Sequence, residues 1–226
     1  MADHNFLQFV PIFAELSEET IKKIVAAGTI KNFKKDSIIL MEEDDGSAMF
    51  VIVSGQVKIA RISSDGKEVI LCILGESDFF GEMAILDGMT RSATVIATED
   101  TEVFLIERNQ FLDLLKTYPE VSISLIKELT KRLRDADLKI KSLSLKDAEG
   151  KVATVILQLA DDVGRIKQGI VEIEKLPLQQ DLANMAGTSR ETISRTLHSF
   201  VKKDLIELDG STLRILSYEK FKDTFA

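Results

Sequence analysis

Four polar residues with base-reading chemistry lie close together near the C-terminal end of the sequence. Arg190, Glu191, Ser194 and Arg195 share one face of a predicted helix, because residues three and four apart are neighbours on a helix surface. Arginine donates paired hydrogen bonds to guanine O6 and N7, and glutamate accepts from the cytosine amino group. The pattern therefore predicts a helix that reads DNA. The alternative is a solvated polar helix face that binds nothing.

A second chemically distinctive set lies between residues 79 and 93. Gly81 opens a short helix-like turn whose exposed N–H groups can approach an anion. Arg91 and Ser92 return beneath this turn and can add a guanidinium and a hydroxyl to the same phosphate. Glu82 cannot bind phosphate, but it can accept a hydrogen bond from a sugar hydroxyl. Together these residues predict a site for a cyclised nucleotide; the alternative is a structural Glu82–Arg91 ion pair in an empty β-roll.

Several other chemistries are disfavoured by what the sequence contains. Cys72 is the single cysteine, so an intramolecular disulfide and a cysteine-based zinc or iron–sulfur site are excluded, and we expect no metal site. His4 and His198 are poorly placed as haem ligands. A redox switch at Cys72 is the alternative to an inert core thiol. No nucleophile–base pair accompanies Glu82 and Arg91, so no catalytic residue is assigned and an enzyme is not expected.

The elements around the base-reading residues have the pattern of a winged helix-turn-helix. Residues 177–186 predict a short helix that begins with Pro177 in its first turn and buries Leu178, Leu182 and Met185. Gly187 permits the tight turn, and Ser189 caps the next helix. That helix is expected to bury a stripe of four apolar residues. They are Ile193, Leu197, Phe200 and Val201.

A hairpin is predicted to follow, over residues 205–216, because apolar residues alternate around the Asp209-Gly210 turn.

Short apolar runs separated by turn residues predict an antiparallel barrel or roll between residues 29 and 108. A short helix over residues 17–25, capped by Ser17, is expected to precede them. The named strand-like runs are 37–40, 49–53, 57–62, 68–74, 93–97 and 103–106. The fold class is therefore α+β.

A long helix is predicted from Pro119 to about Leu145, and a further helix from 146 to 164. Apolar residues on the first of these helices are spaced three and four apart, which is the a/d pattern of a coiled coil. We expect a parallel homodimer, since a helix-turn-helix usually reads a two-fold site; the alternative is an ordinary amphipathic helix on its own domain. The expected dimer seam is Ile126, Leu129, Leu133, Ala136, Ile140 and Leu143.

The formal net charge of −8 is unusual for a DNA-binding protein, because phosphate neutralisation favours a basic surface. The acidic excess lies in residues 1–147, which hold 18 basic and 25 acidic residues; residues 148–226 hold 11 and 12. No apolar run reaches membrane-spanning length, and residues 1–5 do not have the character of a signal peptide, so a cytoplasmic protein without a membrane partner is expected.

The whole sequence resembles the Crp/Fnr family of bacterial transcription regulators. The matching residues are Gly55, Gly66, Gly75, the segments Phe80-Gly81-Glu82 and Arg91-Ser92-Ala93, and Ser189-Arg190-Glu191-Thr192 with Arg195. The resemblance implies a double-stranded β-helix, or jelly-roll, that binds cyclic nucleotides (1–118), a central dimerisation helix (119–147) and a winged helix-turn-helix (148–226).

The resemblance also implies roles for single residues. In relatives that bind cyclic AMP, the positions of Glu82, Arg91 and Ser92 hold the ribose 2′-hydroxyl and the cyclic phosphate. It implies a base pocket formed by Ile59, Ile70, Cys72 and Leu74, and a contribution from Arg132 on the central helix. The remaining ligand-site residues are expected to be Gly81, Met83, Ala84 and Ala93.

One departure from the family pattern concerns the base of the effector. Where cyclic-AMP-responsive relatives carry adjacent threonine and serine, this chain carries Ala136 and Asp137. Asp137 can accept from the amino group of adenine or guanine, or it can pair with a lysine across a dimer. No tightly bound cofactor is expected, and the effector is expected to be cyclic AMP, with cyclic GMP as an alternative.

The function expected from the resemblance is a homodimeric regulator that reads palindromic double-stranded DNA under the control of this effector. The expected half-sites are similar to TGTGA or TTGAT, Ser189, Thr192 and Ser194 touch phosphate or backbone, and RNA polymerase is a partner. The alternative is a regulator of the same fold that is independent of effectors or answers to another small molecule.

Overall fold

The computed structural model describes residues 6–167 and 169–225, and the chain divides into two compact units. The first unit is Met1–Leu133 and the second is Arg134–Ala226, so the division falls inside the long helix α4 (Pro119–Leu145). None of the helices in the described ranges combines the length and apolar character needed to cross a membrane.

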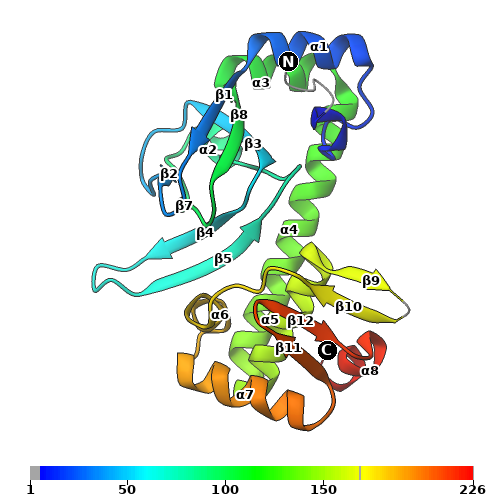
Figure 1. The fold of residues 1–226 in the computed structure, drawn as a ribbon. Coiled ribbons are helices and arrows are strands. Elements are labelled where there is room, and N and C mark those ends of the chain that lie inside the picture. The colour runs from blue at the N-terminus through cyan, green and yellow to red at the C-terminus, as the bar shows by residue number, and fades with distance from the viewer. Residues whose placement is uncertain (1–5, 168, 226) are drawn as a thin grey trace. The chain divides into compact units, whose positions relative to one another are not determined.

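From residue 6 onward, the first unit contains two four-stranded antiparallel sheets that form a β-roll (Figure 1). One sheet has the order β1-β8-β3-β6 and the other β2-β7-β4-β5. The strands are β1 (Thr29–Phe33), β2 (Ile38–Leu40), β3 (Ala48–Ser54), β4 (Val57–Ile62), β5 (Glu68–Leu74), β6 (Phe79–Phe80), β7 (Thr94–Ala97) and β8 (Thr101–Glu107). The helices are η1 (Phe6–Phe9), α1 (Glu18–Ala27), α2 (Met83–Asp87), α3 (Arg108–Thr117) and the first part of α4.

Strand β3 forms the centre of this unit because both of its faces are buried. Phe50 and Ile52 point into the roll, where Phe50 stacks on Phe80 with ring centroids 5.2 Å apart. Met49 and Val51 pack on the other side, against a cluster built with α1, α3 and the start of α4. The continuous apolar run of β3 therefore reflects two cores, and the strand needs no polar face.

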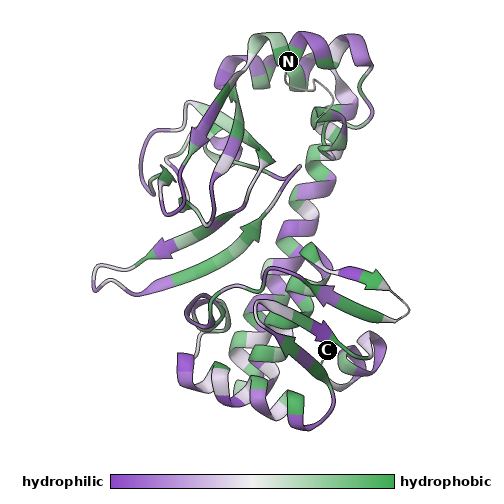
Figure 2. Ribbon diagram, viewed as in Figure 1, coloured by the Kyte–Doolittle hydropathy of each residue, from purple (hydrophilic) through white to green (hydrophobic). Residues whose placement is uncertain are grey.

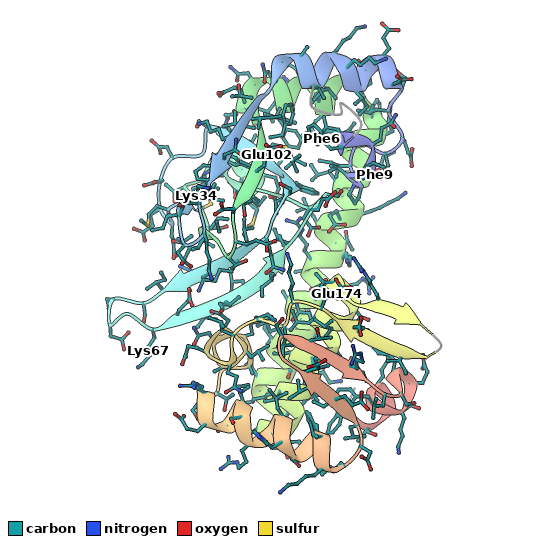
Figure 3. All side chains as sticks on the ribbon, in the orientation of Figure 1. Phe6, Phe9, Lys34, Lys67, Glu102 and Glu174 are labelled. Atoms are coloured by element: carbon teal, nitrogen blue, oxygen red, sulfur yellow. The ribbon has the colours of Figure 1, made fainter. Side chains whose placement is uncertain are left out.

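The N-terminal helices cover this second core. Ser17 caps α1 by accepting a hydrogen bond from the Thr20 backbone N–H at 3.2 Å, which confirms the predicted helix and its cap. On η1, Phe6 packs edge to face on Phe104, whereas Phe9 is 73% exposed (Figure 3).

Within the described residues, the second unit contains a four-stranded antiparallel sheet of order β11-β12-β10-β9 and four further helices. The strands are β9 (Arg165–Lys167), β10 (Ile170–Ile173), β11 (Ile206–Asp209) and β12 (Thr212–Ile215). The helices are α5 (Ala148–Val163), α6 (Gln179–Ala186), α7 (Arg190–Lys202) and α8 (Tyr218–Phe225). The β11–β12 hairpin turns at Gly210, as predicted, with φ +59°.

Three details of the predicted second unit are wrong. Helix α6 begins at Gln179, so Pro177 lies before it and Leu178 is 72% exposed. On α7, Thr196 is buried in the apolar stripe and Val201 is 39% exposed. Helix α5 begins at Ala148 because the Asp147 side chain accepts from the Gly150 backbone N–H at 2.8 Å and so caps the helix there.

Candidate functional site

The segment between β6 and β7 is shaped by two glycines in the left-handed region. Gly81 has φ +83° and Gly88 has φ +74°, and α2 lies between them. The φ of Gly81 favours glycine, and a Cβ atom there would lie 2.8 Å from Arg91 Nη1, so this guanidinium would have to shift. The predicted helix-like turn is therefore present, and its start is packed directly against Arg91.

Arg91 is the central cation of this segment, and it is 5% exposed. Its Nη1 donates to the Gly81 carbonyl at 2.7 Å and its Nη2 donates to the Ala48 carbonyl at 2.8 Å. Its Nε is buried and meets no hydrogen-bond acceptor among the residues that the structure describes. Burial lowers the pKa of Arg91 below its usual value, while the Glu82 and Asp44 charges oppose that shift.

Glu82 is 3% exposed and pairs with Arg132 of α4, whose Nη1 lies 3.2 Å from Glu82 Oε1. Arg132 also donates to the Phe79 carbonyl at 2.8 Å and stacks over the Phe79 ring, with Cζ 4.5 Å from its centroid. Burial raises the pKa of Glu82, and the Arg132 charge offsets part of that rise. The ion pair of Glu82 is thus formed with Arg132, and the alternative Glu82–Arg91 pair is not seen.

The hydroxyl and the small residues of the predicted ligand site surround the start of α2. Ser92 Oγ donates to the thioether sulfur of Met83 at 3.6 Å. Ala84 and Ala93 are buried, at 2% and 5% exposure, and a Cβ on Gly46 would lie 2.4 Å from Ala84 Cβ. The structure therefore brings Gly81 to Ala84 together with Arg91 and Ser92.

The β4–β5 hairpin carries the four residues that the resemblance assigns to a base pocket. Ile59 pairs with Cys72, and Leu74 pairs with Val57, on neighbouring strands of an antiparallel ladder. A register shift between Ile59 and Ala60 interrupts the alternation, and Ile70 is completely buried opposite Ala60. Figure 2 shows β5 as largely hydrophobic, and Figure 3 shows Lys67 at the tip of the hairpin.

Most of the predicted seam residues on α4 are exposed in the single chain. Ile126, Leu133 and Ile140 are 63%, 63% and 62% exposed, and Ala136 and Asp137 are exposed as well. Leu129 is partly buried against the core of the first unit. In the second unit, Leu143 is less exposed, at 37%, and its Cδ2 would lie 3.0 Å from a Cβ on Gly187.

The helix-turn-helix is formed by α6, a turn at Gly187 and α7. Gly187 ends α6 with φ +58°, and its N–H donates to the Ala183 carbonyl. Ser189 caps α7 by accepting from the Thr192 backbone N–H at 3.2 Å. Both features were predicted, and both follow from local chemistry: a glycine for the left-handed C-cap and a hydroxyl for the N-cap.

The outer face of α7 is polar and accessible. Arg190, Glu191 and Arg195 are exposed, Thr192 and Ser194 are half-buried, and no ion pair engages either arginine within the described residues. The Glu191 backbone N–H and the Ser189 hydroxyl lower the pKa of Glu191, which keeps this side chain an acceptor. Lys203, by contrast, lies 2.5 Å from Glu149, so its charge is partly neutralised.

Sequence reasoning missed two contacts that hold α2 in place. Ala48 of β3 contributes its carbonyl to Arg91, and Arg108 of α3 donates to the Ala84 carbonyl at 3.2 Å. Every residue has a backbone carbonyl, so the first contact could not be predicted from residue types. Arg108 lies directly after a buried strand, where a lone arginine is not distinctive.

Comparisons with known proteins agree with this arrangement. Residues 30–118 match a family model described as a cyclic nucleotide-binding domain, and residues 150–224 match a Crp-like helix-turn-helix domain. The chain is 33% identical over 205 residues to the cyclic AMP receptor protein of Thermus thermophilus, covering 91% of this chain and 92% of that protein. It is 31% identical over 189 residues to a CRP-like cAMP-activated global transcriptional regulator of Mycobacterium tuberculosis, covering 84% of each.

Among solved structures, a CooA mutant from Carboxydothermus hydrogenoformans superposes with a TM-score of 0.80 at 25% identity, covering 96% of this chain and 95% of that one.

Proposed function

The chain belongs to the Crp/Fnr family of DNA-binding transcription regulators, and from this premise we propose that it is a homodimer controlled by a cyclic mononucleotide bound in its β-roll. The family consists of transcription regulators, not enzymes. Cyclic AMP is the proposed effector, because one relative reported above is named a cyclic AMP receptor protein and another a cAMP-activated regulator. The domain limits 1–118, 119–147 and 148–226 are part of this proposal.

The observation that carries the effector proposal is the buried guanidinium of Arg91. Its Nε is without an acceptor in the described residues, and a buried unsatisfied donor costs about 1–3 kcal/mol. No carboxylate forms a salt bridge with Arg91 there, so the nearby Glu82 and Asp44 charges offset its charge only without direct contact. A phosphate oxygen at Nε would satisfy the donor and neutralise the charge in one step.

The neighbouring groups favour a cyclic nucleotide over free phosphate. Ser92 adds a hydroxyl donor beside Arg91, whereas Glu82 is an acceptor that would repel a bare phosphate. A sugar hydroxyl can donate to Glu82 while the phosphate lies against Arg91, and cyclisation keeps these two groups of one ligand close together. Asp137 is proposed to accept from the amino group of the base.

The exposed face of α7 is the proposed DNA-reading surface. Arg190 and Arg195 are exposed, and each can donate paired hydrogen bonds to guanine. Glu191 can accept a hydrogen bond from cytosine. Ser189, Thr192 and Ser194 lie at the start of the helix, where side chains and N–H groups can reach phosphate. The proposed operator is a palindrome of TGTGA-like or TTGAT-like half-sites, with RNA polymerase as a further partner.

Effector control requires that the ligand bind the DNA-competent state more tightly than the other state. Coupling between two sites typically changes affinity about 5- to 150-fold. We therefore expect cyclic AMP to raise operator affinity within this range.

Calorimetric titration of the purified chain with cyclic AMP, cyclic GMP and cyclic di-GMP tests the effector proposal. Arg91→Gln should weaken cyclic-AMP binding by about 100-fold, since removing one partner of a buried charge pair costs about 2–5 kcal/mol. Glutamine still has an NH₂ group for one of the two carbonyls, so the loop is expected to fold. Arg61→Gln is the matched control, because Arg61 of β4 is an exposed arginine that pairs with Glu42 and is not a proposed ligand residue; it should leave affinity unchanged within about twofold.

Retained affinity in Arg91→Gln would show that the phosphate lies elsewhere. Absence of binding by all three nucleotides, together with an operator affinity that none of them changes, would leave the effector-independent regulator as the function.

A further inference from the structure

Met83 presents an accessible sulfur at the proposed phosphate site. It is the first residue of α2 and is 49% exposed. Its sulfur accepts the hydrogen bond of Ser92 Oγ at 3.6 Å, and Ser92 is the hydroxyl assigned to the phosphate. The same hydroxyl therefore has two competing acceptors, the thioether in the free protein and the phosphate in the complex.

The competition is mild as long as the sulfur is a thioether, because thioether sulfur is a weak acceptor. Oxidation to the sulfoxide replaces it with a polar S–O group whose oxygen is a strong acceptor. A sulfoxide oxygen at residue 83 would hold the Ser92 hydroxyl more firmly. It would also place partial negative charge beside the oxygens of the incoming phosphate.

We propose that Met83 is an oxidation site through which hydrogen peroxide lowers the cyclic-nucleotide affinity of the β-roll, an inference that rests on the proposed function. The Met83 sulfur attacks one peroxide oxygen, the S–O bond forms as the O–O bond breaks, and the other oxygen leaves as water. The sulfur is oxidised by two electrons and the peroxide is reduced by two. Methionine sulfoxide reductase reverses the change with electrons from a dithiol.

The position of Met83 distinguishes it from the other methionines of the chain. Met49 and Met185 are buried, at 0% and 2% exposure, whereas Met41 and Met89 are exposed, at 45% and 69%. The Met41 sulfur accepts from Thr94, which is not a proposed ligand residue. Among the described residues, Met83 is thus the exposed methionine whose sulfur contacts a residue of the proposed phosphate site.

The test compares each protein before and after peroxide treatment. The full chain is oxidised, treated with dithiothreitol to reduce reversible products at Cys72, and checked for the sulfoxide at residue 83 by peptide mass spectrometry. Calorimetry with cyclic AMP should then show affinity about tenfold weaker, the equivalent of one hydrogen-bond change of about 1.4 kcal/mol. Sulfoxide reductase with dithiothreitol should restore it.

Two variants separate Met83 from general oxidation damage. Met83→Leu should change its own affinity by less than about twofold on oxidation. Met89→Leu, which removes the more exposed methionine beside α2, should remain about tenfold sensitive.

Unchanged affinity in protein that carries the Met83 sulfoxide would overturn the inference, as would equal sensitivity of Met83→Leu and the unsubstituted chain. If the unoxidised chain binds no cyclic nucleotide, the proposed function itself fails and the inference fails with it.

Discussion

Two arginines of the first unit have opposite electrostatic situations. Arg132 faces the Glu82 carboxylate and lies 3.5 Å from Glu128, so its charge is compensated within the protein. Arg91 contacts only carbonyl dipoles through its two Nη atoms, and its Nε is without an acceptor in the described part of the chain. Arg91, which has no direct ion-pair partner in that part of the chain, is therefore the cation that we propose for an anionic ligand, and Arg132 positions Glu82.

On α7, a single substitution tests whether Glu191 reads a base. Glu191→Ala should relax specificity at a single base pair of the operator, with a cost of about 1–3 kcal/mol confined to that position. Removing one acceptor should affect only the one cytosine that Glu191 is proposed to read. Operator variants substituted at each position, measured by fluorescence anisotropy at fixed salt, provide the test.

Lys202→Ala is the matched control at the other end of the same helix. Lys202 is a basic residue in the last turn of α7, and its loss should weaken binding to all operator variants alike, because the attraction of a lysine charge to phosphate carries no sequence information. A uniform loss in Glu191→Ala as well would show that Glu191 does not read a base.

At the element scale, the turn between α6 and α7 combines two constraints at one glycine. Gly187 has φ +58°, and a Cβ there would also lie 3.0 Å from Leu143 Cδ2. Gly210 in the same unit has φ +59° and open space around it. The two positions therefore share a left-handed backbone, which alanine would strain, and differ in the contact.

Gly187→Ala should lower the free energy of unfolding by more than Gly210→Ala does. The left-handed conformation costs about 1–2 kcal/mol in either variant, and the close approach to Leu143 adds to it at residue 187 alone. Urea denaturation monitored by circular dichroism measures both. In a Leu143→Ala background, the costs of Gly187→Ala and Gly210→Ala should lie closer together. Equal costs of the two glycine substitutions in the unsubstituted chain would mean that the Leu143 contact is unimportant.

The elements that the sequence predicted well have a local cause. Ser17 and Ser189 cap their helices, Gly187 ends α6, and the Asp209-Gly210 turn forms the hairpin, each through residues within a few positions of one another. Strands β9 and β10 were missed because they are three and four residues long and have no distinctive turn pattern. Helix α3 was missed because it follows β8 without a break.

The same distinction applies to the candidate site. The residue types at Gly81, Glu82, Arg91 and Ser92 indicated phosphate and sugar chemistry, and the structure brings these residues together. Their partners in the free protein were not predicted, since the Ala48 carbonyl and the Met83 sulfur meet them only after the chain folds. The sequence therefore indicated the chemistry of the candidate site, and the fold shows which partners its residues already have.

For the whole molecule, the exposed apolar stripe on α4 bears on assembly. Leu133 is 63% exposed at a seam position, and Leu138 is 58% exposed on the opposite side of the helix by its spacing. Leu133→Lys should convert the proposed dimer to a monomer, because a buried lysine in a seam leaves an unpaired charge. Sedimentation velocity measures the change.

Leu138→Lys is the control, with nearly the same exposure in the single chain, and it should leave the dimer intact. If both variants remain dimers, the seam does not form the interface; if both become monomers, the interface extends beyond the seam.

The hold of Arg91 on two carbonyls also bears on how fast a ligand arrives and leaves. Gly81 lies in the loop between β6 and α2, and Ala48 lies in β3. Arg91 links the two in the free protein, so this loop is fixed before a ligand enters. Ligand association then does not require an ordering step in that loop. We therefore expect variants of this site to differ chiefly in residence time, while their association rates stay close together.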